Sequence, residues 1–394
     1  MAGNSILKAA NKAKNDEFYT QLTDIEKEMK YYRNHFKGKT VFCNCDDPFE
    51  SNFFKYFVLN FNRLGLKKLI STCYVSSSIV GTQLKYFEDD KGQLSFSFGE
   101  EQVEVISSKK PYKAIVTTVH DTKGDGSVDM FDVARLFEIG ENKLCVLDGD
   151  GDFRSDECIE LLKEADIVVT NPPFSLFRDF VSILVQFKKK FIIIGNKNSV
   201  TYKELFPLIM NGDMWIGARN MNSDFWLYVP NDYSYEKLDE GGNRLKHIMA
   251  CWFTNLDIKK RHEKLILYKN YSPDEYPQYD NYDAININVV QDIPYDYEGV
   301  MGVPITFLDK YNPEQFEILG LVNGKDDLVK INTKRDYTDF KEMRQDGTFT
   351  GSNGKKINGN PVLQGKPSKG NYFVFENETV YSTYARIFIK KISN

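Results

Sequence analysis

Long apolar stretches are missing from this chain of 394 residues. The strongest apolar run, Phe191 to Ile194, has the length of a strand and falls far short of the ~18 residues that a membrane-spanning helix needs. The first residues, Met-Ala-Gly-Asn-Ser, also lack the apolar core of a secretory signal. These absences predict a soluble, cytoplasmic protein without a membrane partner.

Cysteine and histidine are scarce, with six and four residues respectively. One residue separates Cys43 from Cys45, which fits neither a zinc-ligand pair nor a thioredoxin motif, and no histidine lies at metal-ligand spacing from them. The pattern therefore predicts reduced, structural thiols and no metal site.

An excess of charge of one sign is missing too. The net charge is −5, and the basic residues fall in short clusters that are typical of solvated faces. Residues 301–394 carry 14 Lys and Arg against 11 Asp and Glu, a balance of +3, so residues 1–300 carry −8. Charge alone gives no grounds for inferring a nucleic-acid partner.

What the sequence does contain is an alternation of strand-like and helix-like segments over its first two-thirds. With 41% hydrophobic residues, the chain can bury a sizeable core. Helices are expected at 24–36, 51–62, 156–164, 175–188 and 202–210, and strands at 40–45, 68–75, 113–119, 144–147, 167–170 and 190–195, with 225–229 and 248–254 as a closing pair. This alternation predicts an α/β fold with a mostly parallel sheet and helices on both faces.

The texture of the sequence changes after Leu256. Residues 271–297 are rich in Tyr, Asp, Asn and Pro, and residues 346–370 are rich in Gly, Asn, Lys and Ser, as surface loops are. We therefore expect two domains, 1–257 and 258–394, of which the second is loop-rich. The alternative is that these loops decorate a single enzyme domain.

The most specific feature is an apolar strand that ends in Asn171-Pro172-Pro173-Phe174. Prolines cannot extend the hydrogen-bond ladder of a strand, so the chain must turn there, at a strand end where open α/β sheets bind ligands. The Asn171 side-chain oxygen and the Pro172 carbonyl can accept both hydrogens of an exocyclic amino group, while Phe174 stacks on the base that carries it. The motif resembles the catalytic motif of S-adenosylmethionine-dependent amino-methyltransferases. The alternative is an ordinary turn after a buried strand.

Two carboxylates and a proline, Asp46-Asp47-Pro48, follow the strand expected at 40–45. An acid at the end of the first strand is well placed to hold the ammonium group of S-adenosylmethionine. The glycine-rich turn that is usual at this point is missing.

Aromatic and hydroxyl side chains at Phe18, Tyr19 and Thr20 precede the first expected helix. They could wrap the adenosyl or methionine group of that cofactor, or serve as a hydrophobic staple and helix cap. A second cofactor segment is Asp152-Phe153, where the acid can accept from the adenine amino group while the ring covers the base. A calcium loop starting at Asp148 is the competing interpretation, but its sixth and twelfth positions lack the required Gly and Glu.

Together these segments closely resemble the EcoRI-type adenine-specific DNA methyltransferases, and their order is that of the γ group of amino-methyltransferases. The residues that carry the resemblance are Asp16–Gln21, Val41–Phe57, Gly149–Ser155, Asp166–Phe177 and Val300–Phe316. The resemblance implies a Rossmann-like S-adenosylmethionine-dependent methyltransferase sheet in residues 1–257 and a loop-rich target-recognition domain in residues 258–394. It also implies double-stranded DNA as the substrate, N6-methyladenine as the product and a role as the modification enzyme of a restriction-modification system.

The same resemblance implies the roles of individual residues. The catalytic ones would be Asn171, Pro172, Pro173 and Phe174, and the cofactor-binding ones Phe18, Tyr19, Thr20, Asp46, Asp47, Pro48, Asp152 and Phe153.

The resemblance also has gaps. The strand expected at 68–75 has no acid at its end for the cofactor ribose, and residues 76–140 and 326–371 carry little that can be matched. Two alternatives stay open: the same chemistry on RNA or on a protein glutamine, and a non-catalytic DNA-binding relative. No heptad run or exposed apolar helix stands out, so a monomer is the default expectation.

Overall fold

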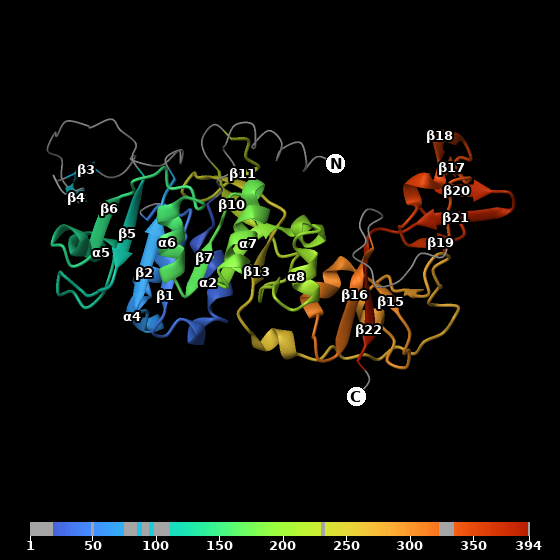
Figure 1. Cartoon of the computed structure of the whole chain (residues 1–394), viewed down its shortest axis with the longest axis horizontal. Coiled ribbons are helices and arrows are strands. Elements are labelled where there is room, and N and C mark those ends of the chain that lie inside the picture. Colours follow the sequence, from blue (N-terminus) through green and yellow to red (C-terminus); the bar gives the residue numbers. More distant parts are fainter. Residues whose placement is uncertain are drawn as a thin grey trace. The chain divides into compact units, whose positions relative to one another are not determined.

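The structure is a computed structural model. It describes residues 19–48, 51–74, 111–229, 233–322 and 335–392, together with the backbone of 85–88 and 94–97. The described residues divide into two compact units, one within Met1–Ser199 and Ile216–Leu256, the other within Val200–Trp215 and Asp257–Asn394. Figure 1 labels helices and strands of both units where there is room.

The first unit is built on an eight-stranded sheet with the order β6-β5-β2-β1-β7-β8-β13-β9. The strands are β1 Thr40–Cys43, β2 Lys68–Thr72, β5 Tyr112–Val116, β6 Lys143–Val146, β7 Ile167–Thr170, β8 Lys190–Asn196, β9 Trp215–Ile216 and β13 Ala250–Thr254. The central strands β2, β1, β7 and β8 run parallel, whereas β5 and β13 run antiparallel to β2 and β8. The sheet is therefore a mixed, Rossmann-like α/β sheet with a parallel centre.

Apolar residues on both faces of the central strands explain why they are buried. Val41, Phe42, Val168 and Val169 are all 0% exposed, as expected for strands covered on both sides. The helices and 3-10 helices of this unit are α2 Leu22–Met29, η1 Arg33–His35, α3 Asn52–Leu59, α4 Phe61–Leu64, α5 Met130–Glu138, α6 Asp156–Glu164, η2 Phe174–Leu176, α7 Phe177–Gln186 and η3 Lys197–Thr201.

The connection from β1 to β2 and the connection from β7 to β8 run in opposite directions along the sheet. Because such connections are right-handed, α3, between β1 and β2, and α7, between β7 and β8, must cover opposite faces. Figure 1 shows α6 and α7 in front of the sheet. The helices expected at 24–36 and 51–62 are each interrupted: the first ends at Met29, and the second is divided at Asn60.

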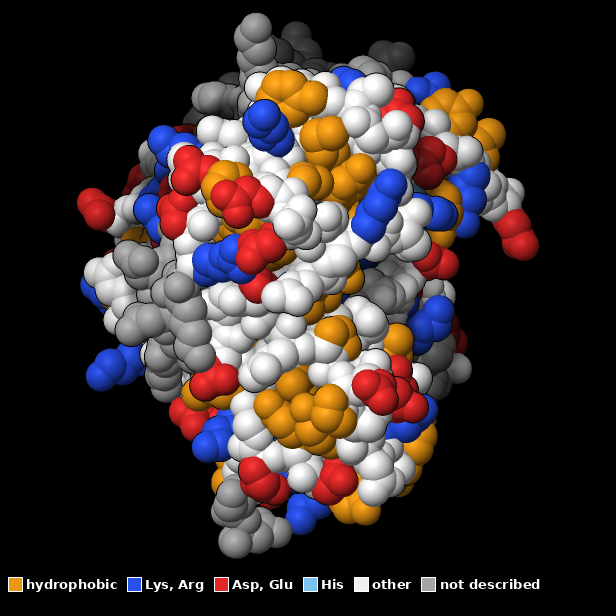
Figure 2. All heavy atoms as spheres, turned by 90° about the vertical axis from the view of Figure 1, so that its right-hand side faces the viewer, with side chains coloured by type: hydrophobic (Ala, Val, Ile, Leu, Met, Phe, Trp, Pro, Cys, Tyr) orange, Lys and Arg blue, Asp and Glu red, His pale blue; other side chains and the backbone are white. Residues whose placement is uncertain are grey.

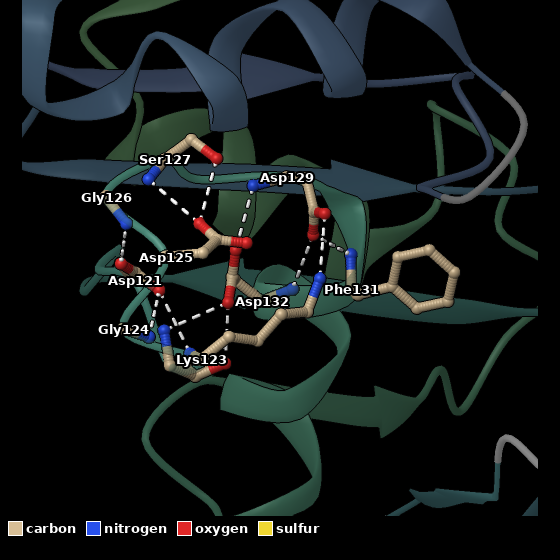
Figure 3. Close-up of polar contacts among 10 residues, drawn as sticks. Asp121, Lys123, Gly124, Asp125, Gly126, Ser127, Asp129, Phe131 and Asp132 are labelled. Atoms are coloured by element: carbon tan, nitrogen blue, oxygen red, sulfur yellow. Dashed lines mark hydrogen bonds and ion pairs between the residues drawn. The ribbon is translucent and has the colours of Figure 1, made fainter.

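A compact polar loop precedes α5 (Figure 3). Asp121 accepts hydrogen bonds from three backbone N–H groups of this loop. Asp129 and Asp132 form a capping box at the start of the helix, and the ammonium of Lys123 lies 2.8 Å from the Asp129 carboxylate. The loop is therefore fixed by its own backbone and charges.

A small antiparallel sheet of the first unit contains β10 (Trp226–Tyr228), β12 (Arg244–His247) and β11 (Lys237–Leu238). The expected closing pair of 225–229 and 248–254 is wrong, because β10 pairs with β12 while β13 pairs with β8. The intervening chain turns back at Asp239, whose carboxylate accepts the Gly241 and Asn243 N–H groups. Strand β10 pairs with β12, which is nearer to it in the chain than β13 is. Elsewhere in this unit, the backbone of β3 (Lys85–Glu88) pairs with that of β4 (Leu94–Ser97).

The second unit contains two sheets, with the orders β14-β15-β22-β16 and β18-β17-β20-β21-β19. Its elements are α8 Phe206–Met210, η4 Lys259–His262, β14 Ile285–Asn286, η5 Val290–Asp292, β15 Met301–Pro304, η6 Ile305–Lys310, β16 Phe316–Val322, β17 Lys341–Met343, β18 Phe349–Asn353, η7 Gly354–Ile357, β19 Val362–Gln364, β20 Tyr372–Phe375, β21 Glu378–Ser382 and β22 Arg386–Lys391. Short turns join β20 to β21 and β21 to β22, whereas longer segments join β14 to β15 and β15 to β16. Residues 200–215, which the sequence placed in the first domain, pack with this unit, where α8 contacts β16.

Two expectations from composition can be compared with the structure. No disulfide joins the six cysteines, all of which lie among the described residues. In the part of the chain that the structure describes, no helix has the length and apolarity needed to cross a membrane.

Candidate active site

A pocket lies at the carboxyl ends of β1, β2 and β7, with an empty volume of about 450 Å³, part of it open to solvent. It is lined by Tyr19, Thr20, Cys45, Asp46, Asp47, Ser51, Asn52, Phe53, Cys73, Tyr74 and Asn171. Strand β1 lies between β2 and β7 in the sheet, and the chain forms β2 on one side of it first and β7 on the other side later. The pocket therefore occupies the switch point of the sheet, where open α/β sheets bind ligands.

The Asn-Pro-Pro-Phe turn reaches this pocket through its first residue. Strand β7 ends at Thr170, as the sequence predicted, and Asn171 lines the pocket. Pro172 is buried, Pro173 is half-buried, and Phe174 begins η2, which leads into α7. The Phe174 side chain is only 8% exposed.

Two buried carboxylates follow β1, and different hydroxyl groups bind them. Asp46 Oδ1 accepts from the Ser51 hydroxyl at 2.7 Å, and Asp46 Oδ2 accepts from the Thr170 hydroxyl. Asp47 Oδ1 accepts from the Tyr112 phenol at 2.9 Å. Both side chains line the pocket, so the acidic pair predicted from the sequence is placed where a ligand would bind.

The turn between β1 and these carboxylates forms without glycine. Cys45 has a φ of 66°, the left-handed conformation that glycine usually supplies at such a bend. The absence of a glycine-rich turn in the sequence therefore does not mean the absence of the bend. Pro48 is buried in the turn that follows and is not among the residues that line the pocket.

Cys43, the last residue of β1, is fully buried and does not line the pocket. Burial, together with the negative charge of Asp46, raises the pKa of the Cys43 thiol well above its ordinary value. A protonated thiol is a poor nucleophile, so Cys43 is suited to a structural role.

The amino-terminal segment forms one wall of the pocket. Tyr19 exchanges backbone hydrogen bonds of 3.0 and 2.8 Å with Tyr228, and the Asn52 side chain donates to the Thr20 carbonyl at 2.8 Å. The buried Thr20 hydroxyl has no hydrogen-bond partner among the described residues. The cap of α2 is Gln21, without a side-chain hydrogen bond, so the structure does not support the alternative role of Thr20 as a helix cap. Phe18 lies outside the described residues.

Asp152 and Phe153 lie beside the pocket and do not line it. Arg154 donates to both Asp152 oxygens, at 2.9 and 2.6 Å, and these hydrogen bonds lower the pKa of that carboxyl. Phe153 is buried against Phe180, with ring centroids 5.1 Å apart. Gly151, with a φ of 78°, packs so tightly that a Cβ there would meet the backbone of β2's carboxyl end.

The other residues that line the pocket were not predicted as site residues from the sequence: Cys45, Ser51, Asn52, Phe53, Cys73 and Tyr74. For several of these residues, the sequence contains a pattern that could have identified them. Cys73 and Tyr74 directly follow β2, so the strand-end rule that located Asn171 applies to them as well. Ser51 caps α3 by accepting from the Phe53 N–H, and a Ser before an apolar helix is a common start signal.

Comparison with known proteins identifies relatives along nearly the whole chain. The family described as "Adenine-specific methyltransferase EcoRI" matches residues 6–391. The Type II methyltransferase M.EcoRI of Escherichia coli is 47% identical over 344 residues, which are 85% of this chain and 95% of that protein. M.MgeORF184P of Mycoplasma genitalium is 36% identical, covering 88% and 94% of the two chains, and M.MpnI of Mycoplasma pneumoniae is 37% identical, covering 79% and 83%. No solved structure matches the chain.

Proposed function

This chain belongs to the EcoRI family of adenine-specific methyltransferases, and we propose that it methylates N6 of a specific adenine in double-stranded DNA, with S-adenosylmethionine as the methyl donor. We further propose that it works in the cytoplasm as the modification enzyme of a restriction-modification system. The naming of its relatives as Type II methyltransferases supports this assignment. The observation that carries the chemistry is Asn171, which shares a pocket at the switch point with two buried carboxylates.

The side chains of the pocket suit the proposed cofactor. Asp46 and Asp47 line it, and its described lining residues include no Lys, Arg or His. S-adenosylmethionine carries a sulfonium and an ammonium group, both of which carboxylates attract. The buried Thr20 hydroxyl offers a further polar contact. We assign Tyr19, Thr20 and Asp47 to the methionine part of the cofactor.

The loop at Asp152 and Phe153 is the proposed contact for the adenosine part. It adjoins the pocket because Gly151 packs against the carbonyl of Cys73, which lines it. The hydrogen bonds from Arg154 lower the pKa of the Asp152 carboxyl, and a carboxylate has lone pairs enough to accept a further hydrogen bond.

The reaction requires positioning more than acid-base chemistry. Bound S-adenosylmethionine supplies a methyl group that its sulfonium already activates. Adenine N6 is a poor nucleophile, because its lone pair is delocalised into the ring. When the Asn171 side-chain oxygen and the Pro172 carbonyl accept the two N6 hydrogens, the nitrogen becomes more tetrahedral and its lone pair is available to form the new N–C bond. The bond between the methyl carbon and the donor's sulfur would break in the same step and leave its electron pair on a neutral thioether, and N6 would release its extra proton to water. Positioning of this kind supplies up to ~7–11 kcal/mol in favourable intramolecular cases.

The target adenine must leave the duplex to reach Asn171, at a cost of a few (~2–4) kcal/mol. Stacking on Phe174 would offset part of that cost. Because the Phe174 side chain is 8% exposed, stacking requires the ring to become accessible as the base enters.

The DNA substrate is not argued from charge. On the face of the molecule in Figure 2, basic and acidic side chains are interspersed, without a field of one sign. The assignment to DNA rests on the family and on the chemistry of the Asn171 turn.

The experiment is single-molecule sequencing of DNA from a methylation-free host that expresses the chain, beside hosts that express Asn171→Ala and the exposed control Asn220→Ala. We expect N6-methyladenine at one short motif with the wild-type chain and the control, and none with Asn171→Ala. An unmodified genome despite soluble expression would refute DNA methylation. Methyl transfer to RNA or protein in a parallel assay would then identify the substrate, and no transfer at all would indicate a non-catalytic relative.

A further inference from the structure

We infer that the two adjacent carboxylates have different roles: Asp46 and Thr170 are positioning residues that fix Asn171 at the pocket, whereas Asp47 binds the ammonium group of the cofactor. This inference rests on the proposed function and divides a pair that the sequence treats as equivalent.

Asp46 connects the ends of the elements that surround the pocket. Its side chain is 7% exposed, and both carboxylate oxygens accept hydrogen bonds from hydroxyls, of Ser51 at the start of α3 and of Thr170 at the end of β7. Its backbone N–H donates to the Thr72 carbonyl at 2.9 Å, and its carbonyl accepts from the Ser71 hydroxyl at 2.6 Å, both in β2. A buried carboxylate bonded in this way is structural, because moving it would leave these hydroxyls to be satisfied elsewhere.

Thr170 links Asp46 to the catalytic residue Asn171. The register between β1 and β7 pairs Val41 with Ile167 and Phe42 with Val168, and β1 then ends at Cys43. Beyond Cys43, the Thr170 hydroxyl connects the end of β7 to the chain that follows β1, because it donates to both the Asn44 carbonyl and Asp46 Oδ2.

Asn171 is the next residue in the chain, so its position depends on this contact. A β-branched side chain has a stiff χ1 angle, and a hydroxyl fixed at its end also fixes the backbone that carries it. Thr170 is 0% exposed, which leaves it no alternative partner in solvent. Loss of the hydroxyl would let the Asn171 amide shift relative to the pocket, and a shift of ~1 Å can cost about 100-fold in rate.

Asp47 is held differently. Its contact with the Tyr112 phenol engages Oδ1 and reaches to β5, which does not carry the catalytic turn. Asp47 therefore supplies charge to the pocket without taking part in the connection between β1 and β7. An ammonium bound to it would form a charge-assisted hydrogen bond, of the stronger kind.

The test compares Thr170→Val, Thr170→Ser and Asp47→Asn in the full chain. Single-turnover methyl transfer is measured on unmethylated bacterial genomic DNA at saturating S-adenosylmethionine, and the Kd of S-adenosylmethionine is measured by calorimetry without DNA. The matched control is Thr254→Val. Thr254 is also a fully buried threonine, and its hydroxyl donates to the Phe191 carbonyl at 2.8 Å.

Thr170→Val should lower the single-turnover rate about 10- to 100-fold and leave the Kd within about 2-fold, whereas Thr170→Ser, which keeps the hydroxyl, should restore most of the rate. Asp47→Asn should raise the Kd about 10-fold and leave the rate at saturation within a few-fold of wild type. Thr254→Val should lower the melting temperature without this split between rate and Kd.

Three results would overturn the inference: a normal rate for Thr170→Val, an equal defect in Thr170→Val and Thr170→Ser, or an unchanged Kd for Asp47→Asn. If Thr170→Val does not fold, Thr170→Ala, which also removes the hydroxyl but is smaller, decides the matter. Its single-turnover rate should fall about 10- to 100-fold with the Kd within about 2-fold, and a rate near that of wild type would refute the positioning role. A wild-type chain that binds S-adenosylmethionine but methylates no DNA would instead refute the proposed function.

Discussion

Replacing Cys45 with glycine should stabilise the first unit, although the residue lies in the pocket. Cys45 has a φ of 66°, and left-handed backbone costs a residue with a Cβ about 1–2 kcal/mol. Glycine removes that penalty but adds about 0.4–1 kcal/mol of unfolded-chain entropy. The side chain is half-buried, and its thiol contact with Asn44 Oδ1, at 3.1 Å, is of a weak kind. The net gain should be about 0.5–1 kcal/mol.

Thermal unfolding provides the assay, since a gain of that size corresponds to about 1–4 °C for a unit of 150–250 residues. Cys45→Ala keeps the Cβ and should not share the gain, so the difference between the two variants isolates the backbone contribution. Lys188→Gly is a matched control outside the pocket, because Lys188 follows α7 with a φ of 51° and should gain a similar amount. A Cys45→Gly variant that melts below Cys45→Ala would refute the reasoning.

Three further predictions concern stability. Each ring nitrogen of His262 lies 2.8 Å from a carboxylate oxygen, and these hydrogen bonds, first of all the one to Glu314, raise the pKa of His262. The stability that they contribute should be present below pH ~6.5 and lost as the pH rises through the raised pKa. Melting temperatures measured over this pH range should show the dependence in the wild type and not in His262→Gln. Backbone and hydroxyl hydrogen bonds within the loop before α5 lower the pKa of Asp132. The contribution of Asp132 to folding stability should therefore be present above pH ~3.9 and lost as the pH falls further. Acid titration followed by circular dichroism should show a smaller loss of stability in Asp132→Asn than in the wild type. Gly195→Ala would place a Cβ 2.4 Å from the buried Phe177 ring and should cost about 1–3 kcal/mol, so denaturant unfolding that matches wild type would contradict that packing.

The central elements could be predicted closely because several local signals agree there. Helix α6 and strand β7 begin and end at the predicted residues, since Ser155 caps the helix and a continuous apolar run leads into the prolines. The strands of the second unit were not predicted, because most of them are short and they do not alternate with α-helices along the described part of the chain. The partner of β10 was predicted wrongly because β11 and β12 form a hairpin, and β10 pairs with the other edge of β12 instead of with β13.

For the candidate site, sequence reasoning located the edge of the sheet but not the division of labour along it. The strand-end rule places Asp46, Asp47 and Asn171 together from their positions in the chain alone. Nothing in the letters Asp-Asp tells which carboxylate is bound by Thr170, because that depends on where β1 stops and how Cys45 turns. Asp46 accepts from Thr170 at the end of β7, whereas Asp47 accepts from Tyr112 at the start of β5. Neighbours in the sequence thus contact different strands, which is why they can take different roles in one reaction.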